Sequence, residues 1–320
     1  MRVILIRYSS LGDVVLVTSV ARSIKTAYPE AEVDILTKEE YFPVFSHNPD
    51  IGRVLSRPPF RERYDYMADL HSSIRSALSR RLIRAGRKMV YNKAATARRV
   101  FLHSGMMQGT LEKTVPERYI EPFIQAGLKV TLSKPRIEVS PREEEEASRL
   151  ACPGPYLALV PGAKWMTKEW FQEKYVQLII KASRELGLNT VILGTEEEKK
   201  LSDSIVAGTG TFRSHVINLA GKTDIRLFAA LIKGAAAAVT PDSAALHIGW
   251  GLSVPVVALF GPTVKEFGFQ PDDEKVAILE KDLECRPCSL HGSAKCRYTD
   301  RACMQRIEVH EVIDALRGFL

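Results

Sequence analysis

The first half of the chain alternates short apolar runs with longer amphipathic segments. Residues 14–27 place apolar side chains at helical spacing, which predicts a helix. The apolar runs are rich in Val, Ile and Leu and predict strands over residues 3–6, 33–36, 66–70 and 88–92. Strands that alternate with helices form βαβ units, so we expect a parallel sheet covered by helices.

The second half repeats this rhythm. Apolar runs predict further strands over residues 156–162, 190–194, 216–221, 237–242 and 256–262. Amphipathic segments predict helices over residues 169–186 and 224–235. The acidic and then Pro- and Gly-rich sequence between residues 140 and 155 is typical of a break between domains.

The fold class that we predict is α/β, with two Rossmann-like parallel-sheet domains that face a cleft. A length of 320 residues exceeds what one hydrophobic core usually serves. We place the domains at residues 1–150 and 151–320. In open α/β sheets ligands bind beyond the carboxyl ends of the strands, so the loops after the strands are where we look for chemistry.

Composition narrows the class of protein. With 45% hydrophobic and 26% charged residues, the chain is neither disordered nor fibrous. Its longest apolar runs, such as residues 254–260, fall well short of the roughly 18 residues that cross a bilayer. The N-terminal sequence turns polar too early for a signal peptide. We therefore expect a soluble, cytoplasmic protein.

The net charge of +7 comes from the first half of the chain. Residues 1–150 hold 25 Lys and Arg against 18 Asp and Glu, whereas residues 151–320 hold 20 of each kind. Residues 53–99 alone carry 13 basic and 3 acidic side chains. The arginines of this stretch include Arg75, Arg80, Arg81, Arg84, Arg87, Arg98 and Arg99. Such a patch suits nucleic acid, an anionic membrane surface or a phosphorylated substrate, or else it forms only solvated helix faces.

The first loop of interest, residues 7–15, follows the opening strand. Ser9, Ser10 and Gly12 offer small side chains and backbone amides, and Asp13 lies at the start of the predicted helix. Asp13 is either a carboxylate favoured by the helix dipole or a base that takes a proton from a substrate hydroxyl. The loop lacks the Gly-x-Gly-x-x-Gly fingerprint of dinucleotide binding.

The second loop, residues 159–171, runs from a strand through Pro-Gly into a polar turn and a helix. Lys164 and Lys168 flank the turn, and Thr167 lies beside Lys168. A lysine near a helix N-terminus opposes the helix dipole, so its position favours a bound anion such as phosphate. The Walker A pattern is missing from this loop.

The third loop lies within residues 237–263. Asp242 and Ser243 are natural N-caps for a helix that runs through His247. The free amides of that helix N-terminus would point at an anionic ligand. Both Asp242 and His247 also have ordinary structural explanations, the first as a cap and the second as a core side chain.

Together these segments resemble the ADP-heptose:lipopolysaccharide heptosyltransferases, glycosyltransferase family nine. The resemblance rests on RYSSLGDVV, PGAKWMTKEW, DSAALH with VPVVALFGPT, and the closing cysteine segment, and it covers nearly the whole chain. It implies the GT-B architecture, with an N-terminal domain for the acceptor and a C-terminal domain for the ADP-sugar. The cysteine pattern favours the type that adds the second heptose.

The resemblance implies roles for individual residues. It makes Asp13 the general base and Lys168 a catalytic contact of the donor diphosphate. The donor-binding residues that we expect are Ser9, Ser10, Gly12, Thr167, Asp242, Ser243, Ala244 and His247. Two positions depart from the family pattern, since Ala244 replaces a glycine and Phe171 replaces a proline.

The implied reaction is a direct displacement at the anomeric carbon, with inversion and without a metal. Asp13 would deprotonate the acceptor hydroxyl, while Lys168 and the amides near Ser243 would stabilise the departing diphosphate. The nearest approach to an Asp-x-Asp metal motif is the adjacent pair Asp272 and Asp273, so we expect no required cofactor.

The implied acceptor is the phosphorylated, Kdo-bearing lipid A core, which is polyanionic and lies in the cytoplasmic leaflet of the inner membrane. The acceptor or membrane contacts that we expect are Arg75, Arg80, Arg81, Arg98 and Arg99. The protein would act as a monomer that associates peripherally with this membrane.

Four of the five cysteines, Cys285, Cys288, Cys296 and Cys303, lie close together in the sequence. Their spacing permits a structural zinc site, two disulfides or free thiols, and none is needed for the family's chemistry. Cys152 is interpreted as a hinge or core residue.

Three alternatives remain. One is a heptosyltransferase of the first or third type, and another is a sugar-nucleotide epimerase on the same scaffold, which would need no acceptor. The third is a non-enzymatic, basic nucleic-acid-binding protein that uses the charge of residues 53–99. Against it, Tyr64, Tyr66 and Tyr91 are the main aromatic residues near these arginines, and no nucleic-acid-binding motif is present.

Overall fold

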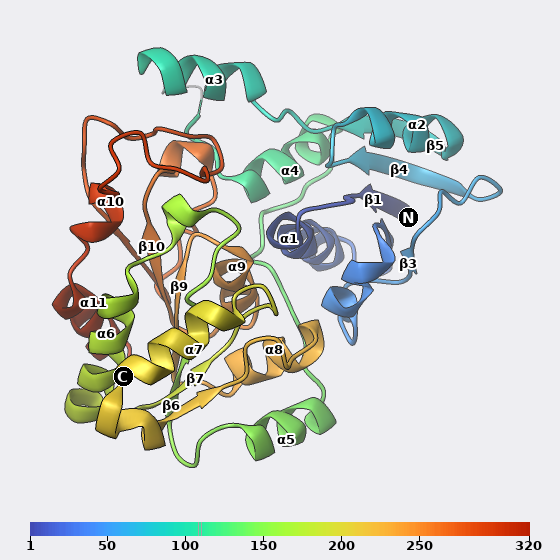
Figure 1. Ribbon diagram of the computed structural model, residues 1–320. Coiled ribbons are helices and arrows are strands. Elements are labelled where there is room, and N and C mark those ends of the chain that lie inside the picture. The colour runs from blue at the N-terminus through green and yellow to red at the C-terminus, as the bar shows by residue number, and fades with distance from the viewer. Residues whose placement is uncertain (108, 110) are drawn as a thin grey trace. The chain divides into compact units, whose positions relative to one another are not determined.

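The computed structural model describes residues 1–107, 109 and 111–320, and the chain forms two compact units. The first unit comprises Met1–Glu138 with Glu266–Phe269, and the second comprises Val139–Lys265 with Gln270–Leu320. Each unit has its own parallel sheet with helices packed on it (Figure 1). The predicted α/β class with two Rossmann-like sheets is therefore confirmed.

The first sheet consists of five parallel strands in the order β3-β2-β1-β4-β5. Their bounds are β1 Arg2–Ile6, β2 Glu32–Leu36, β3 Val54–Leu55, β4 Arg63–Asp69 and β5 Arg84–Val90. The chain moves outward from β1 to β2 and β3 and then returns to the other side of β1 for β4. The loops after β1 and β4 thus lead in opposite directions. The place between two such strands, where the strand order reverses, is the topological switch point, and ligands of this fold bind there.

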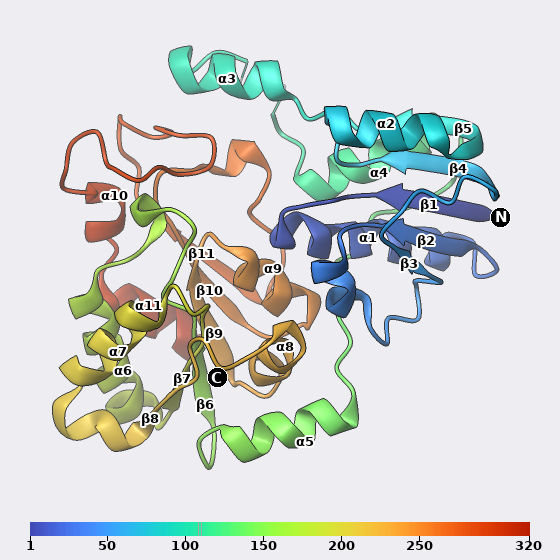
Figure 2. The same ribbon diagram turned by 45° about the vertical axis from the view of Figure 1, so that its right-hand side comes forward.

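Helices cover both faces of the first sheet, with α1 and α2 on opposite sides (Figure 2). The helices are α1 Leu11–Ala27, α2 Ile74–Leu82, α3 Ala95–Ser104 and α4 Val115–Gln125, and η1 Glu39–Phe45 is a 3₁₀ helix. The predicted helix over residues 14–27 begins earlier, at Leu11, because Ser10 serves as its N-cap.

The last strand of this sheet, β5, begins earlier than the predicted strand at residues 88–92. It is an edge strand, and Arg84, Arg87 and Lys88 on it are exposed. Charged side chains are typical of sheet edges, and they interrupt the apolar run that the prediction relied on. Part of the basic stretch therefore lies on a strand rather than on solvated helix faces.

The second sheet has six parallel strands in the order β11-β10-β9-β6-β7-β8. Their bounds are β6 Tyr156–Leu159, β7 Asn189–Ile192, β8 Val216–Asn218, β9 Ala237–Pro241, β10 Val256–Phe260 and β11 Val276–Glu280. Here the chain reverses direction across the sheet between β6 and β9. The loops after these two strands, which contain Lys168 and Asp242, therefore flank the switch point of the second unit.

The central strands β6, β9 and β10 are buried along their whole length between two layers of helices. In Figure 1, α6 and α11 lie on one face of this sheet and α8 and α9 on the other. The bounds are α5 Pro141–Leu150, α6 Gln172–Leu186, α7 Lys199–Gly208, α8 Ile225–Lys233, α9 Ala244–Gly251, α10 Ala302–Gln305 and α11 Val309–Arg317. Across the residues that are described, no helix has both the length and the apolar character needed to span a membrane.

The two units meet in sequence before α5, earlier than the predicted boundary at residue 150. Helix α5 belongs to the second unit because Glu143 forms a two-pronged ion pair with Arg226 on α8, with Nε–Oε1 and Nη2–Oε2 distances of 2.7 and 2.6 Å. The segment Glu266–Phe269 belongs to the first unit, where the Val115 N–H donates to the Gly268 carbonyl at 2.8 Å. Long-range contacts of this kind leave no local pattern in the sequence.

Candidate functional site

Asp13 lies in the first turn of α1. The N–H and Oγ of the N-cap Ser10 donate to Asp13 Oδ2 at 3.3 and 2.9 Å. A carboxylate at this position also interacts favourably with the helix dipole. Ser9 is half-buried before the cap, and Gly12 is buried in the first turn. Asp13 therefore has the helix-terminal role that the sequence allows, and a functional role rests on its other contacts.

Arg7 holds the same carboxylate from the end of β1. Its Nη2 lies 2.6 Å from Asp13 Oδ2, and its Nη1 donates at 2.6 Å to the carbonyl of Leu70, just after β4. The side chains of Arg7 and Asp13 are only 8% and 14% exposed. An arginine partner with so little solvent stabilises the ionised carboxylate and fixes its direction. A general base must be ionised in this way.

The other carboxylate oxygen contacts a buried phenol on α4. Tyr119 OH donates to Asp13 Oδ1 at 3.2 Å. Tyr119 is fully buried, and burial raises its pKa well above the usual value, so the phenol stays protonated and donates. Oδ2 thus faces a cation and Oδ1 a neutral donor. Together Arg7 and Tyr119 fix the direction of the carboxylate.

Two further basic groups lie near this carboxylate. The pKa of His71, which follows β4, falls to about 4 because of burial and then the charges of Arg7 and Lys93. Burial and then Arg7 also lower the pKa of Lys93. Within the described part of the chain, His71 Nδ1 is buried without a hydrogen-bond partner. His71 is therefore a neutral imidazole at pH 7.

The sequence patterns identified Asp13 but missed Arg7, Tyr119, His71 and Lys93. A signal was present for Arg7 and His71, because each is a basic residue at the carboxyl end of a buried strand. Tyr119 lies 106 positions from Asp13 in the sequence and gives no such signal.

The arginines predicted to contact an acceptor divide into two groups. Arg80 pairs at 3.3 Å with Asp69, which has no exposed side-chain surface, and Arg98 Nη2 donates to the Phe267 carbonyl at 2.6 Å. These two arginines stabilise the first unit itself. The three that remain on the surface are Arg75, Arg81 and Arg99.

In the second unit, Lys168 and Asp242 form a buried ion pair. Lys168 Nζ lies 2.5 Å from Asp242 Oδ2, and the side chains are 12% and 8% exposed. Thr263 Oγ1 donates to the same oxygen at 2.7 Å. Thr167, by contrast, is turned away and exchanges hydrogen bonds of 2.9 and 2.8 Å with the backbone of Ser293. Thr167 therefore fixes the turn that presents Lys168.

Helix α9 begins beside this pair. Ser243 is its N-cap and accepts from the Ala245 N–H at 3.3 Å. Asp242, expected as a second cap, is paired with Lys168 instead. Ala244 occupies the first helical position, where a Cβ atom causes no backbone strain, and His247 is buried one turn further along. The positive end of the helix dipole and the Lys168 ammonium thus lie at one switch point, a natural place for an anion.

Glu198, at the end of the Glu-Glu-Glu run after β7, was not predicted as a site residue. Its carboxylate lies over two glycines, because a Cβ atom at Gly162 would be 2.1 Å from Glu198 Cδ and one at Gly194 would be 2.7 Å from Oε2. The Thr195 N–H donates to Oε2 at 2.9 Å, and burial raises the pKa of Glu198. The glycines after β6 and β7 therefore make room for a carboxylate next to the switch point.

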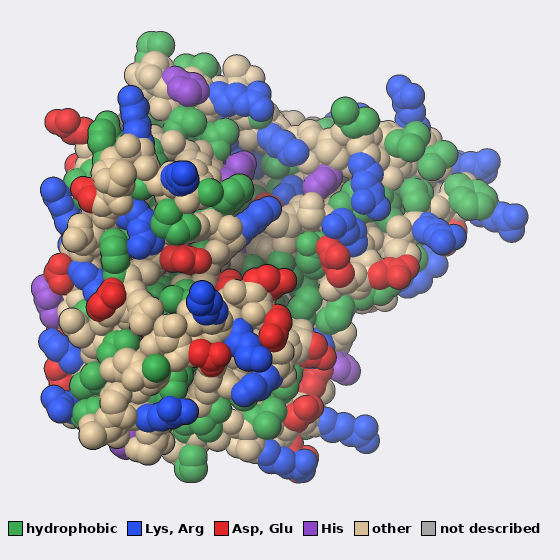
Figure 3. Space-filling view, viewed as in Figure 1, with side chains coloured by type: hydrophobic (Ala, Val, Ile, Leu, Met, Phe, Trp, Pro, Cys, Tyr) green, Lys and Arg blue, Asp and Glu red, His purple; other side chains and the backbone are tan. Residues whose placement is uncertain are grey.

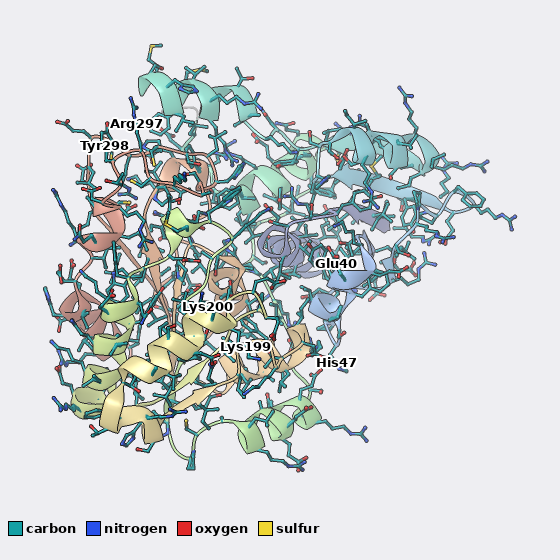
Figure 4. All side chains as sticks on the ribbon, in the orientation of Figure 1. Glu40, His47, Lys199, Lys200, Arg297 and Tyr298 are labelled. Carbon is teal, nitrogen blue, oxygen red and sulfur yellow. The ribbon has the colours of Figure 1, made fainter. Side chains whose placement is uncertain are left out.

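The cysteine segment between β11 and α10, where Figure 4 labels Arg297 and Tyr298, supports the Lys168 turn. Besides the Thr167 contacts, Arg301 Nη1 donates to the carbonyls of Met166 and Glu169, both at 3.0 Å. All five cysteines are free thiols in the structure. Burial, and then the charge of Cys288, raise the pKa of Cys303 to about 11. Cys152 is a buried core residue.

No group of three or more His, Cys, Asp or Glu side chains among the described residues is arranged to hold a metal ion. Asp273, considered above as part of a metal motif, accepts hydrogen bonds from Trp250 Nε1 at 2.9 Å and from the Lys275 N–H at 3.0 Å. It therefore has a structural role. A surface hollow of about 520 Å³ lies along α7, bordered by Lys199 and Lys200 (Figure 4), and contains none of the predicted site residues.

Comparison with known proteins gives consistent matches. A family model for glycosyltransferase family 9 (heptosyltransferase) matches residues 57–298. Lipopolysaccharide heptosyltransferase 2 of Salmonella typhimurium is 27% identical, over 83% of this chain and 84% of that protein. The structure of E. coli ADP-heptose LPS heptosyltransferase II aligns with a TM-score of 0.78 at 23% identity, covering 100% and 98% of the two chains. E. coli heptosyltransferase WaaC with ADP aligns with a TM-score of 0.71 at 16% identity, covering 100% of both chains.

Proposed function

The chain belongs to glycosyltransferase family 9, the heptosyltransferases, and we propose that it transfers heptose from ADP-heptose to the inner core of lipopolysaccharide. The observation that carries this proposal is the Lys168–Asp242 ion pair beside the N-terminus of α9. A buried lysine and a helix N-terminus at a switch point suit the diphosphate of a nucleotide sugar. Family membership favours transfer over both the epimerase and the nucleic-acid-binding alternatives.

The donor diphosphate takes the place of Asp242 as the partner of Lys168 in this proposal. The charge that develops on the leaving ADP is then stabilised by the ammonium and by the amides at Ser243 and Ala244. His247 and Thr167 contribute to donor binding indirectly in this proposal. His247 packs within α9, and Thr167 holds the turn that carries Lys168. The adenine nucleotide is proposed because ADP-heptose is part of the name of E. coli heptosyltransferase II, and because the structure of E. coli WaaC is described with ADP.

Glu198 extends the donor site to the ribose. In Rossmann folds, an acidic side chain after the second strand of the sheet binds the ribose hydroxyls. Glu198 follows β7, the neighbour of β6, and its carboxylate lies at the ends of both strands. We assign it to the ribose of ADP, while Ser9, Ser10 and Gly12 remain proposed donor contacts from the first unit.

Asp13 is the proposed general base. Its carboxylate takes the proton from an acceptor hydroxyl as that oxygen attacks the anomeric carbon, and the bond to the β-phosphate oxygen of ADP breaks. The attack comes from the side opposite the leaving group, so the configuration at the anomeric carbon inverts. The reaction is proposed to need no metal, and a loss of turnover in EDTA that magnesium restores would contradict this.

The proposed acceptor is the phosphorylated Kdo-lipid A core at the cytoplasmic leaflet of the inner membrane. Arg75, Arg81 and Arg99 are the predicted contacts that remain on the surface, whereas Arg80 and Arg98 are engaged within the first unit. The protein is proposed to act there as a monomer that associates peripherally with the membrane.

The test is transfer from ADP-heptose to a series of core acceptors that differ by one heptose. A heptosyltransferase II-like enzyme uses only acceptors that already carry the first heptose, and use of the heptose-free acceptor would show the first type instead. Asp13→Asn lowers kcat by about 10²–10⁴-fold, the range for loss of a general base. Near-full turnover in this variant would refute the assignment of Asp13.

Structural zinc at Cys285, Cys288, Cys296 and Cys303 is a separate proposal that rests on their spacing. The described thiols are not arranged as a metal site. The proposed transfer reaction uses no thiol, so it does not depend on zinc at these cysteines. Metal analysis of protein purified without added zinc decides the matter. One zinc per chain supports the site, and its absence leaves free thiols or disulfides.

A further inference from the structure

Helix α2 is amphipathic, but it exposes its apolar face and buries its polar face. Ile74, Leu78 and Leu82 are 94%, 61% and 50% exposed, and their spacing of four residues places them on one face of the helix. Ser76 and Ser79 lie on the buried face instead, at 0% and 6% exposed. Helices at the surface of a globular protein normally bury their apolar face, so this stripe needs an explanation.

Both buried serines of α2 have hydrogen-bond partners in the observed orientation of the helix. Ser79 Oγ is hydrogen-bonded to Tyr8 OH at 2.7 Å, and Tyr8 belongs to the core cluster beneath α2. Ser76 Oγ donates to the Ser73 carbonyl at 3.0 Å and accepts from the Ser73 N–H at 2.8 Å. Turning α2 to bury its apolar side chains would break the hydrogen bond between Ser79 and Tyr8. The apolar stripe is therefore held outward by the folded structure.

The surroundings of the stripe are basic. The sequence contains no Asp or Glu between Asp69 and Glu112. Arg75 and Arg81 are exposed on α2 itself, and Arg84 is exposed just after it. In Figure 3, hydrophobic and basic side chains lie together along the edge of the first unit where Figure 1 shows α2. The surface thus combines an apolar centre with a cationic rim.

We propose that α2 docks this protein onto an anionic phospholipid bilayer. Ile74, Leu78 and Leu82 would enter the boundary between headgroups and acyl chains, while the arginines contact lipid phosphates. Charge argues against a second copy of the chain, because a symmetric contact through this face would place arginines against arginines. The proposal rests on the proposed function in placing the substrate at a membrane, and it names the surface that brings the enzyme there.

The test is co-sedimentation with vesicles of phosphatidylethanolamine and phosphatidylglycerol, compared with vesicles of phosphatidylcholine alone. The triple variant Ile74→Gln, Leu78→Gln and Leu82→Gln retains good helix formers at all three positions. We expect it to bind anionic vesicles at least about tenfold more weakly, from the apolar surface that no longer enters the bilayer. Ile124→Gln on α4, where Ile124 is 53% exposed, is the matched control and binds like the wild type.

The arginines are tested separately. Arg81→Gln with Arg84→Gln should weaken binding to anionic vesicles by about fivefold per residue and leave the weak binding to phosphatidylcholine unchanged. Added salt should reduce the binding of the wild type and have less effect on this variant.

Two results would overturn the proposal. One is equal vesicle binding by the wild type and the triple variant. The other is a dimer of the wild type in sedimentation velocity that the triple variant dissolves, which would make α2 a protein interface. Transfer to a delipidated, water-soluble acceptor is measured in parallel and should be the same in wild type and triple variant. A protein that binds vesicles but transfers no heptose would refute the proposed function and leave the docking surface standing.

Discussion

Replacement of Lys168 by Met separates the structural and catalytic roles of its ion pair. Asp242 is only 8% exposed, so the variant leaves a buried carboxylate with Thr263 as its remaining side-chain donor. Breaking a buried ion pair costs about 3–5 kcal/mol, and we expect about 3 kcal/mol because Thr263 still donates. For a domain of this size, the melting temperature of the second unit should fall by about 6–12 °C. Scanning calorimetry of the ligand-free protein measures this.

The same variant should lose transition-state stabilisation. Lys168 is the proposed cation for the leaving diphosphate, and removal of one such group lowers kcat by about 10²–10³-fold. The double variant Lys168→Met with Asp242→Asn removes the unpaired charge and should regain most of the stability but none of the activity. A Lys168→Met enzyme with turnover within about threefold of wild type would refute the diphosphate assignment. An unchanged melting temperature would refute the buried ion pair.

Three further predictions concern other parts of the two units. The hydrogen bond from Arg226 lowers the pKa of Glu143 to about 2, so this pair stabilises the fold fully above about pH 5 and progressively less as the pH falls toward 2. Arg226→Ala should therefore lower the free energy of unfolding at pH 7 by about 2 kcal/mol, the range for hydrogen bonds to a charged group, and flatten its decline below pH 5. Urea titrations at several pH values would show this, and equal losses at pH 7 and pH 2 would contradict it. Tyr119→Phe should lower kcat about tenfold with little change in the KM for ADP-heptose, because it removes a hydrogen bond that fixes the direction of the Asp13 carboxylate, and a rise in that KM alone would count against the geometry. Glu198→Gln should raise the KM for ADP-heptose about tenfold and leave kcat nearly unchanged, and steady-state kinetics that show the opposite pattern would exclude a ribose contact.

The sequence determined the parts of this protein that depend on local pattern. Apolar runs separated by amphipathic segments located most strands and helices, because a buried parallel strand and a half-buried helix have different hydrophobic periods. The rule that ligands bind after the strands directed attention to the loops of Asp13, Lys168 and Ser243, and all three lie at switch points of the sheets.

Only the tertiary structure decided which side chains meet across the chain. Asp13 lies between Arg7 and Tyr119, and Asp242 pairs with Lys168 rather than capping α9. Neither contact is visible in a local window, since the partners of Asp242 and Tyr119 lie 74 and 106 positions away. The boundary before α5 likewise depends on a distant ion pair.

Helix α2 shows most clearly what hydrophobic periodicity in the sequence does not determine. Its sequence places Ile74, Leu78 and Leu82 at the spacing of a core-facing stripe, yet the structure turns that stripe outward. Periodicity indicates which residues share a face, but it does not indicate what covers that face. The hydrogen bond between Ser79 and Tyr8 decides the orientation, because a buried hydroxyl must keep its partner. The sequence thus determined the two sheets and the residues at their carboxyl ends, and tertiary contacts decided which of those residues pair and which surface remains open.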